Sequence, residues 1–404
     1  MSTMQIPFHR PSIGQEEIDE VTATLKSGWL TTGPRTAQFE REFREYLGAP
    51  NALAVNSCTA GLHLALKALN VSEGAEVITT PLTFCASVNV ILHSGATPVL
   101  ADVKPDGNID PESVAARITE RTRAIIPVHL AGLPVDMTAI WALARKHRLV
   151  VIEDCAHAVG AHYRGWPIGA GDPSRGDYSD AAAFSFYATK NLTTGEGGML
   201  TTHREDVADR AKVLCLHGIS KDAWNRYTDR GNWYYEVLEP GFKYNMSDLQ
   251  SAIGIHQLRK LEAFTETRTS YAALYHSLLG DVEEFELPPS KADCRHAWHL
   301  YMLRLNLGKL GINRAEFMTL LRERGVGSSV HFIPIPLHPF FAPYLRNGQN
   351  QTPVALELYP RIVSLPLFPA MTEEEIHFVA DSAKEIVRKT RKNKPFAVVA
   401  GGKR

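Results

Sequence analysis

Three groups in the sequence could act together on one ligand: a carboxylate, an amine and a turn that binds anions. Asp154 closes the most apolar predicted strand, LVVIED, and Lys190 follows another apolar run in FSFYATKNLTTGEGGM. The turn NSCTAG at residues 56–61 leads from a predicted strand straight into a helix, whose free N–H groups and dipole can hold a phosphate. Because ligands bind at the carboxyl ends of parallel strands, we expect the three groups to face one crevice.

These groups match the needs of pyridoxal phosphate (PLP). Its aldehyde condenses with a lysine amine, a carboxylate can hold its ring nitrogen protonated, and its phosphate suits a helix N-terminus. The protonated ring stabilises the carbanion on which transamination depends. Taken singly, a strand-end Asp is more often a cap and a Lys more often a solvated charge, so the prediction depends on their combination.

Other common chemical motifs do not occur. The sequence has no G-x-G-x-x-G between a strand and a helix, no P-loop, no H-E-x-x-H and no G-x-S-x-G. The two histidines of HAWH, residues 296–299, lie in a predicted strand and would point to opposite faces, which is poor geometry for a metal. The 5 cysteines include no C-x-x-C pair. We therefore expect no metal site and no disulfide framework.

The elements that position these groups are predicted by apolar runs and helical stretches. Between Ala52 and Thr202 the runs are ALAVN, EVITT, TPVLADV, AIIPV, LVVIEDC, AAAFSF and GGMLTT. Their nearly continuous apolar character is typical of strands covered on both faces. Helices are predicted at 60–69, 86–93, 111–118 and 137–147. The fold class is therefore α/β, with a mainly parallel, doubly wound sheet.

The pattern changes after about residue 206. A long helix is predicted over 247–279, followed by strands in HAWHLYMLRL and SSVHF and helices at 314–324 and 372–389. These elements predict a smaller α+β domain. We expect a large domain over residues 1–246, and the linking helix with the small domain over 247–404.

Composition excludes several classes of protein. The 43 Lys and Arg residues balance 44 Asp and Glu residues, so the net charge of -1 provides no excess of positive charge that would bind nucleic acid. No stretch reaches the roughly 18 apolar residues that cross a bilayer, and the first 20 residues lack the basic and apolar regions of a secretory signal. We expect a cytoplasmic protein that binds neither nucleic acid nor membrane.

A family resemblance extends this interpretation. The strings GWLTTGP, NSCTAGLHLAL, PVHLAG, VIEDCAHAVGAHYRG, FSFYATKNLTTGEGG, PGFKYNMSD and SVHF resemble, in order and spacing, the nucleotide-sugar aminotransferases of the DegT/StrS group. The resemblance runs from Pro7 to about Pro369. It implies the PLP-dependent transferase fold of type I, with a seven-stranded sheet in the large domain.

The resemblance also implies roles for individual residues. Lys190 would form the covalent link to PLP and then act as base and acid of the proton shift, and Asp154 would pair with the ring nitrogen. His157, where many members have glutamine, would lie near the ring hydroxyl. Phe84 would stack on the ring.

Further roles concern the phosphate and the substrate. Thr59, Ala60 and Ser185 would hold the phosphate of PLP. Asn245 would reach the phosphate of the neighbouring subunit, which implies a homodimer with shared active sites. Trp29 and His331 are candidate substrate contacts. The more ordinary interpretation of Trp29 is packing within a loop, and that of His331 is a structural residue of a strand.

The implied reaction transfers an amino group from glutamate to a nucleotide-linked 4-keto sugar and releases 2-oxoglutarate. The segments IPFHRPSIGQEEIDEV, AHAVG, HAWHL and SLPLFPAMT most resemble members that act on a UDP-linked sugar of the 4-amino-4-deoxy-L-arabinose type. Residues 221–239, which include Trp224, Arg226, Tyr227 and Trp233, could stack a uracil or meet a diphosphate, or could line a dimer contact.

Several alternatives stay open at this point. The ketosugar could carry dTDP or GDP and be a 3-keto or 4-keto sugar, and the protein could be a non-catalytic regulator that binds PLP. A related dehydratase would have histidine in place of Lys190. An oxidoreductase that uses a nicotinamide is a more distant alternative.

Overall fold

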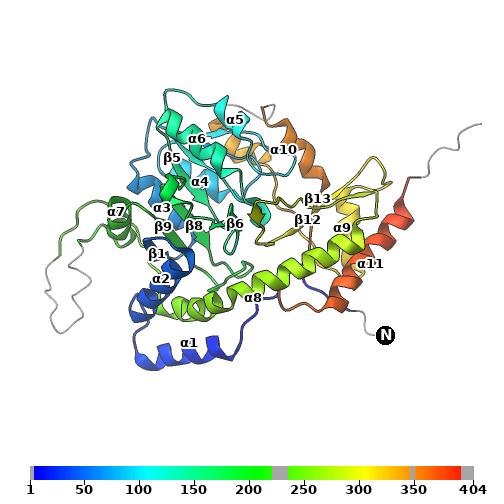
Figure 1. Cartoon of the computed structure of the whole chain (residues 1–404), viewed down its shortest axis with the longest axis horizontal. Helices are drawn as coiled ribbons and strands as arrows, with labels where there is room; N and C mark the ends of the chain where they lie inside the picture. Colours follow the sequence, from blue (N-terminus) through cyan, green and yellow to red (C-terminus); the bar gives the residue numbers. More distant parts are fainter. Residues whose placement is uncertain (1–3, 221–234, 346–350, 393–404) are drawn as a thin grey trace, which may run out of the picture.

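A seven-stranded sheet lies at the centre of the computed structural model, which describes residues 4–220, 235–345 and 351–392 (Figure 1). The strand order is β1-β9-β8-β5-β4-β2-β3. In that order the strands are Asn51–Val55, Gly198–Thr202, Ala181–Ser185, Val150–Asp154, Thr122–Ile126, Glu76–Thr79 and Thr97–Leu100. Neighbouring strands run parallel except β9, which pairs antiparallel with both β1 and β8. The predicted α/β class and mainly parallel seven-stranded sheet are confirmed.

Helices connect and cover these strands. Before and within the sheet region they are α1 (Gln15–Ser27), α2 (Pro34–Leu47), α3 (Cys58–Ala68), α4 (Ala86–His93), α5 (Pro111–Ala115), α6 (Met137–His147) and α7 (Glu205–Cys215). Every residue of β2, β8 and β9 is buried, as the continuous apolar runs predict for strands with helices on both faces.

The long helix α8 (Asp248–Leu279) runs from α1 and α2 at one end to α11 (Glu373–Thr390) at the other (Figure 1). It begins with a capping box, in which Ser247 caps the backbone of Gln250 and the Gln250 side chain returns to the backbone N–H of Ser247. The first half of α8 packs into the core beneath the large sheet, and its second half packs into a separate core with α11. The predicted boundary between the two domains at residue 246 therefore stays a prediction, because α8 contributes residues to both cores.

A second, antiparallel sheet lies beside α8 and α11. Its strand order is β10-β12-β13, with bounds Phe285–Glu286, Tyr301–Leu305 and Ile362–Leu365. Helices α9 (Arg314–Glu323) and α10 (Pro353–Leu358) accompany it. A third, small sheet joins β11 (Cys294–Arg295), β6 (His162–Tyr163) and β7 (Trp166–Pro167).

Two predicted strands in this part of the chain differ from the structure: HAWHLYMLRL is a strand only in its second half, which is β12, and SSVHF is not a strand. HAWH is irregular, because Trp298 has a φ of 46° and donates its backbone N–H to Nδ1 of His296, so the strand begins only at Tyr301. In SSVHF only Ser329 pairs, with Ser364 of β13. The chain then meets Pro334 and Pro336, which have no N–H group to continue a ladder. β10 and β13 lie in segments for which no strand was predicted.

No helix in the described ranges is both long enough and apolar enough to cross a membrane.

Candidate active site

Three elements of the large sheet end at the same edge. Asp154 is the last residue of β5, Ser185 is the last residue of β8, and α3 begins three residues after β1. Because β1, β8 and β5 point the same way, their carboxyl ends meet there. A cavity of about 510 Å³ opens at this edge, and both Asp154 and Lys190 line it.

Most of the predicted site residues line this cavity. They are Thr59, Phe84, Asp154, His157, Ser185, Lys190 and His331. These residues come from positions between 59 and 331, and the fold brings them to one edge of one sheet. Phe84 is 60% exposed, so one face of its ring is open to a ligand.

Asp154 is a buried carboxylate held in one orientation. Its Oδ2 accepts a hydrogen bond of 2.7 Å from the Ser87 hydroxyl, and its Oδ1 accepts one of 3.1 Å from the backbone N–H of Ala156. The thiol of Cys58 lies 3.9 Å from Oδ1. These two hydrogen bonds fix the direction in which the carboxylate points into the site.

Lys190 lines the same cavity as Asp154 and lies five residues beyond the end of β8. Loss of hydration lowers the pKa of its amine to about 8, although Cys58 and Asp154 act in the opposite direction. An amine with this pKa is partly neutral near neutral pH, so it can attack an aldehyde and can accept a proton.

The N-terminus of α3 supplies donors for an anion. Ser57 is its N-cap, and its hydroxyl accepts the N–H of Ala60 at 3.1 Å. The other first-turn N–H groups have no acceptor within the helix, and the positive end of the helix dipole adds to them. Gly198 of β9 passes so close that a Cβ there would lie 2.6 Å from the Cys58 nitrogen, so only glycine permits this approach.

His157 has a defined tautomer. The backbone N–H of Ala131 donates to its Nδ1 at 3.2 Å, so the ring carries its proton on Nε2. Burial, together with the charge of Lys190, moves the pKa of His157 well below its usual value, so the ring stays neutral. A neutral histidine of this tautomer presents a hydrogen-bond donor, suited to a phenolic oxygen.

His331 does not lie in a strand, contrary to the ordinary interpretation of SVHF, and it faces the cavity. Its Nδ1 is 2.9 Å from the Ser364 hydroxyl, and burial and the Lys190 charge lower its pKa to about 4.

Three predicted residues are not among those lining the cavity. The N–H of Ala60 is already used by the α3 cap. Asn245 donates from its amide to the Thr32 hydroxyl at 2.7 Å, and the indole of Trp29 donates to the Thr32 carbonyl at 3.1 Å. Trp29 and Asn245 therefore meet at Thr32. Trp224, Arg226, Tyr227 and Trp233 lie outside the described residues.

Sequence reasoning missed two neighbours of the site. Ser87 orients Asp154, although 67 residues separate them. His299 lines the cavity with its ring 4.4 Å from that of His157, and its Nδ1 is 3.2 Å from the Asn191 amide oxygen. The only sequence signal for His299 is the HAWH string. The predicted strand argued against a joint role for its two histidines, because it would point them to opposite faces.

The residues present fit PLP: an amine, an oriented carboxylate and a helix N-terminus surround one cavity. A family model described as the DegT/DnrJ/EryC1/StrS aminotransferase family matches residues 11–384 of the sequence. The chain belongs to this family.

Two curated relatives of the aminotransferase match almost its whole length. The spore coat polysaccharide biosynthesis protein SpsC of Bacillus subtilis is 49% identical over 385 residues, which are 95% of this chain and 97% of SpsC. The uncharacterized protein MJ1066 of Methanocaldococcus jannaschii is 49% identical over 387 residues, covering 96% of this chain and 98% of its own.

Among solved structures, Spr1654 of Streptococcus pneumoniae, described as a sugar aminotransferase, is similar in both its PLP form and its PMP form. The PLP form has a TM-score of 0.87 at 32% identity, covering 96% of this chain and 99% of Spr1654. The PMP form has a TM-score of 0.88. Family and neighbours together make this chain a PLP-dependent sugar aminotransferase.

Proposed function

We propose that this aminotransferase moves the amino group of glutamate to a nucleotide-linked 4-keto sugar, with a UDP-linked sugar of the 4-amino-4-deoxy-L-arabinose type preferred, and releases 2-oxoglutarate. The single observation that carries the proposal is the placement of Lys190 and Asp154 on one cavity beside the N-terminus of α3. The similarity to SpsC supports a sugar destined for a polysaccharide. We place the reaction in the cytoplasm.

Bound PLP supplies an aldehyde and an electron-accepting ring, the chemistry that allows a proton to leave the amine-bearing carbon. Asp154 holds a proton on the ring nitrogen, and the Ser87 hydroxyl keeps its carboxylate aimed. His157 donates its Nε2 proton to the ring hydroxyl oxygen, and Phe84 covers one ring face. Thr59, Ser185 and the α3 N-terminus bind the phosphate.

Lys190 is the residue that would hold the cofactor covalently, and its amine would be free while glutamate is bound. Its amine, with a pKa of about 8, would then act as the base that takes the proton from the amine-bearing carbon of glutamate and as the acid that gives this proton back. In the second half-reaction the same amine moves a proton in the reverse direction, and the sugar leaves aminated.

The neighbouring subunit completes the site in this proposal. Asn245 and Trp29 meet at Thr32 and do not line the cavity of their own chain, which supports a role for Asn245 at the partner's phosphate. The functional unit is then a homodimer with shared active sites.

A two-stage assay tests the substrate. The PLP-loaded enzyme is first given glutamate, and release of 2-oxoglutarate is measured with a coupled enzyme. The glutamate-charged enzyme is then given a UDP-linked 4-keto pentose, a dTDP-linked 4-keto hexose or a GDP-linked 4-keto hexose. We expect the UDP pentose to give the highest kcat/KM by about tenfold or more, on the scale of specific pocket contacts.

Lys190→Ala is the control and should give no turnover in either stage. Equal or faster rates with the dTDP sugar would overturn the UDP assignment. Glutamate consumption without transfer to any ketosugar would overturn the assignment of the acceptor.

A further inference from the structure

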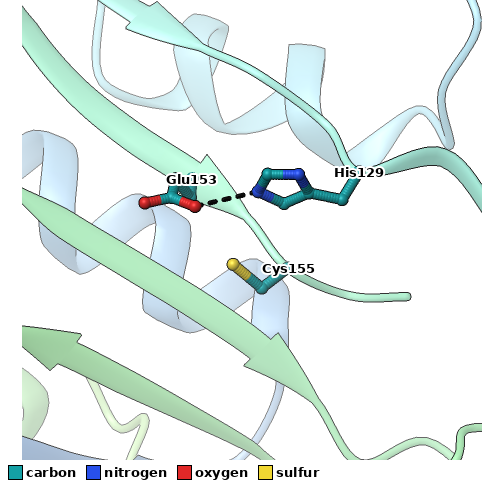
Figure 2. Close-up of side chains that lie close together, drawn as sticks. All are labelled: His129, Glu153 and Cys155. Atoms are coloured by element: carbon teal, nitrogen blue, oxygen red, sulfur yellow. Dashed lines mark hydrogen bonds and ion pairs between the residues drawn. The ribbon is translucent and has the colours of Figure 1, made fainter. Parts of the chain in front are cut away.

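Three buried side chains that are not among those lining the cavity lie close together: His129, Glu153 and Cys155 (Figure 2). Side chains alternate along a strand, so Glu153 of β5 points to the face opposite Asp154. Nε2 of His129 lies 2.9 Å from Oε2 of Glu153, and both side chains are at most 1% exposed. The backbone N–H of Val135 donates to Nδ1 of His129 at 3.1 Å. His129 therefore carries its proton on Nε2 and donates it to Glu153.

This hydrogen-bond pattern is unsuited to a cation. A metal would need the lone pair of Nε2, but that atom bears the proton because Nδ1 already accepts from Val135. Burial also raises the pKa of the Cys155 thiol well above its usual value, which disfavours a thiolate ligand. The group is a histidine–carboxylate pair with a neutral thiol beside it.

The pair lies at the base of a tight turn, residues 129–135. Ala131 has a φ of 58°, a left-handed conformation that a residue with a side chain adopts only when its surroundings hold it. Asn108 clamps the turn from the other side, because its Oδ1 accepts from the N–H of Leu130 and its Nδ2 donates to the carbonyl of Leu133.

This turn carries the contacts that set two histidines of the cavity. The N–H of Ala131 donates to His157, and the carbonyls of Ala131 and Gly132 accept from the N–H groups of Leu300 and Ala297. His299 lies between these last two residues. A shift of the turn would therefore break the hydrogen bond that fixes the tautomer of His157, and it would also move the segment that contains His299.

We propose that the buried Glu153–His129 pair positions a residue of the PLP site. The pair fixes the conformation of residues 129–135, and the backbone of this turn holds His157 with its Nε2 proton toward the cofactor. Glu153 and His129 touch neither cofactor nor substrate, so they are positioning residues. The proposal rests on the assigned role of His157 in the proposed function.

The test compares two replacements of Glu153. Glu153→Leu keeps the volume but removes the acceptor, and Glu153→Gln keeps an oxygen that can accept from His129. Glu284, which is 2% exposed and pairs with Arg391, provides the matched control Glu284→Leu next to β10. For each PLP-loaded variant we would measure the visible absorption band of bound cofactor, the cofactor Kd and the Tm.

We expect Glu153→Leu to shift the band and to raise the cofactor Kd about tenfold, the scale of one hydrogen bond, with Glu153→Gln restoring most of both. Asn108→Ala should shift the band in the same direction, because it frees the same turn by a different route. Glu284→Leu should lower the Tm and leave the band in place.

If Glu153→Leu and Asn108→Ala lower the Tm but keep the wild-type band and Kd, the pair is only structural and the proposal is overturned. If Glu153→Leu does not fold, the absorption band and cofactor Kd of Asn108→Ala alone decide whether the turn positions His157. These readouts do not depend on which sugar is aminated, so failure of the substrate assignment leaves this test intact.

Discussion

The Lys190 amine is the group whose chemistry depends most on its surroundings. Burial at the cavity wall lowers its pKa from 10.5 to about 8, because the charged ammonium form loses hydration. Lys190 is therefore charged below pH 8 and neutral above it, so its nucleophilicity rises as the pH passes through this value.

Competitive labelling measures this pKa without turnover. In the protein free of PLP, acetylation of Lys190 by acetic anhydride, followed by mass spectrometry of its peptide, should increase with pH with a midpoint near 8. A midpoint near 10.5, the ordinary value for lysine, would show that the amine is not tuned by its site.

Ser87 gives a second prediction at this scale. Its hydroxyl donates to Asp154, so Ser87→Ala leaves one carboxylate oxygen with one fewer donor and free to turn. We expect kcat/KM to fall about tenfold to a hundredfold, since a hydrogen bond to a charged group contributes roughly 1.5–3 kcal/mol.

A matched control for Ser87 lies on the same helical segment. Ser94 is also buried, and its hydroxyl donates to the carbonyl of Ile91, at the end of α4 away from Asp154. Ser94→Ala should lower the Tm while leaving kcat/KM within about twofold of the wild type, because its bond is local. Equal losses of activity in both variants would contradict the orienting role of Ser87.

Among individual residues, the sequence could predict those at the ends of apolar strands. Asp154 and Lys190 could be predicted because each follows an apolar run and the two occur together with an anion-binding turn, although either one alone has a more ordinary structural explanation. Ser87 and His299 are not visible, because their importance comes from bonds between distant segments, Ser87 with Asp154 and His299 with Asn191. No local pattern encodes such a pairing.

Among the elements, the junction of α2 and α8 depends on one buried carboxylate. Asp248 accepts hydrogen bonds from the backbone N–H groups of Gly33, Arg35 and Thr36, and from the Thr36 hydroxyl. It therefore caps the N-terminus of α2 from the first turn of α8 and ties the two helices together.

Asp248→Ala should lower the free energy of unfolding by about 3 kcal/mol or more, because several donors are left buried without an acceptor. Asp248→Asn keeps one oxygen and should lose about half as much. Urea unfolding of both variants measures the difference. Equal and small losses would show that water replaces the carboxylate and that the junction does not depend on it.

Elements with strong local signals were predicted well. The bounds of α4 and α6 agree with the predicted 86–93 and 137–147, and α8 begins at the predicted Ser247 cap. The antiparallel sheet of β10, β12 and β13 was predicted less well. Its strands β10, β12 and β13 are short and come from distant segments, so pairing between them, rather than local propensity, decides where they begin and end.

For the whole molecule, the proposed shared site predicts complementation between two inactive variants. Lys190→Ala removes the amine, and Asn245→Ala removes the side chain assigned to the partner's phosphate. When the two are mixed and allowed to exchange subunits, half of the dimers are mixed, and one of the two sites in each has both native groups.

The mixture should recover about a quarter of the wild-type activity, as random exchange within a two-fold dimer requires. Steady-state turnover after exchange measures it, with each variant alone as the control. If Asn245 acts within its own chain, no site in the mixed dimer is complete, and the activity stays at the level of the separate variants.

The central claim is that one amine, Lys190, holds PLP in the cavity that Asp154 also lines. Borohydride reduction of the PLP-loaded enzyme, followed by peptide mapping, tests this claim most directly. The account predicts that a single peptide carries the pyridoxyl group and that the label is on Lys190, with no label in Lys190→Ala. A label on another lysine, or undiminished labelling of Lys190→Ala, would contradict it.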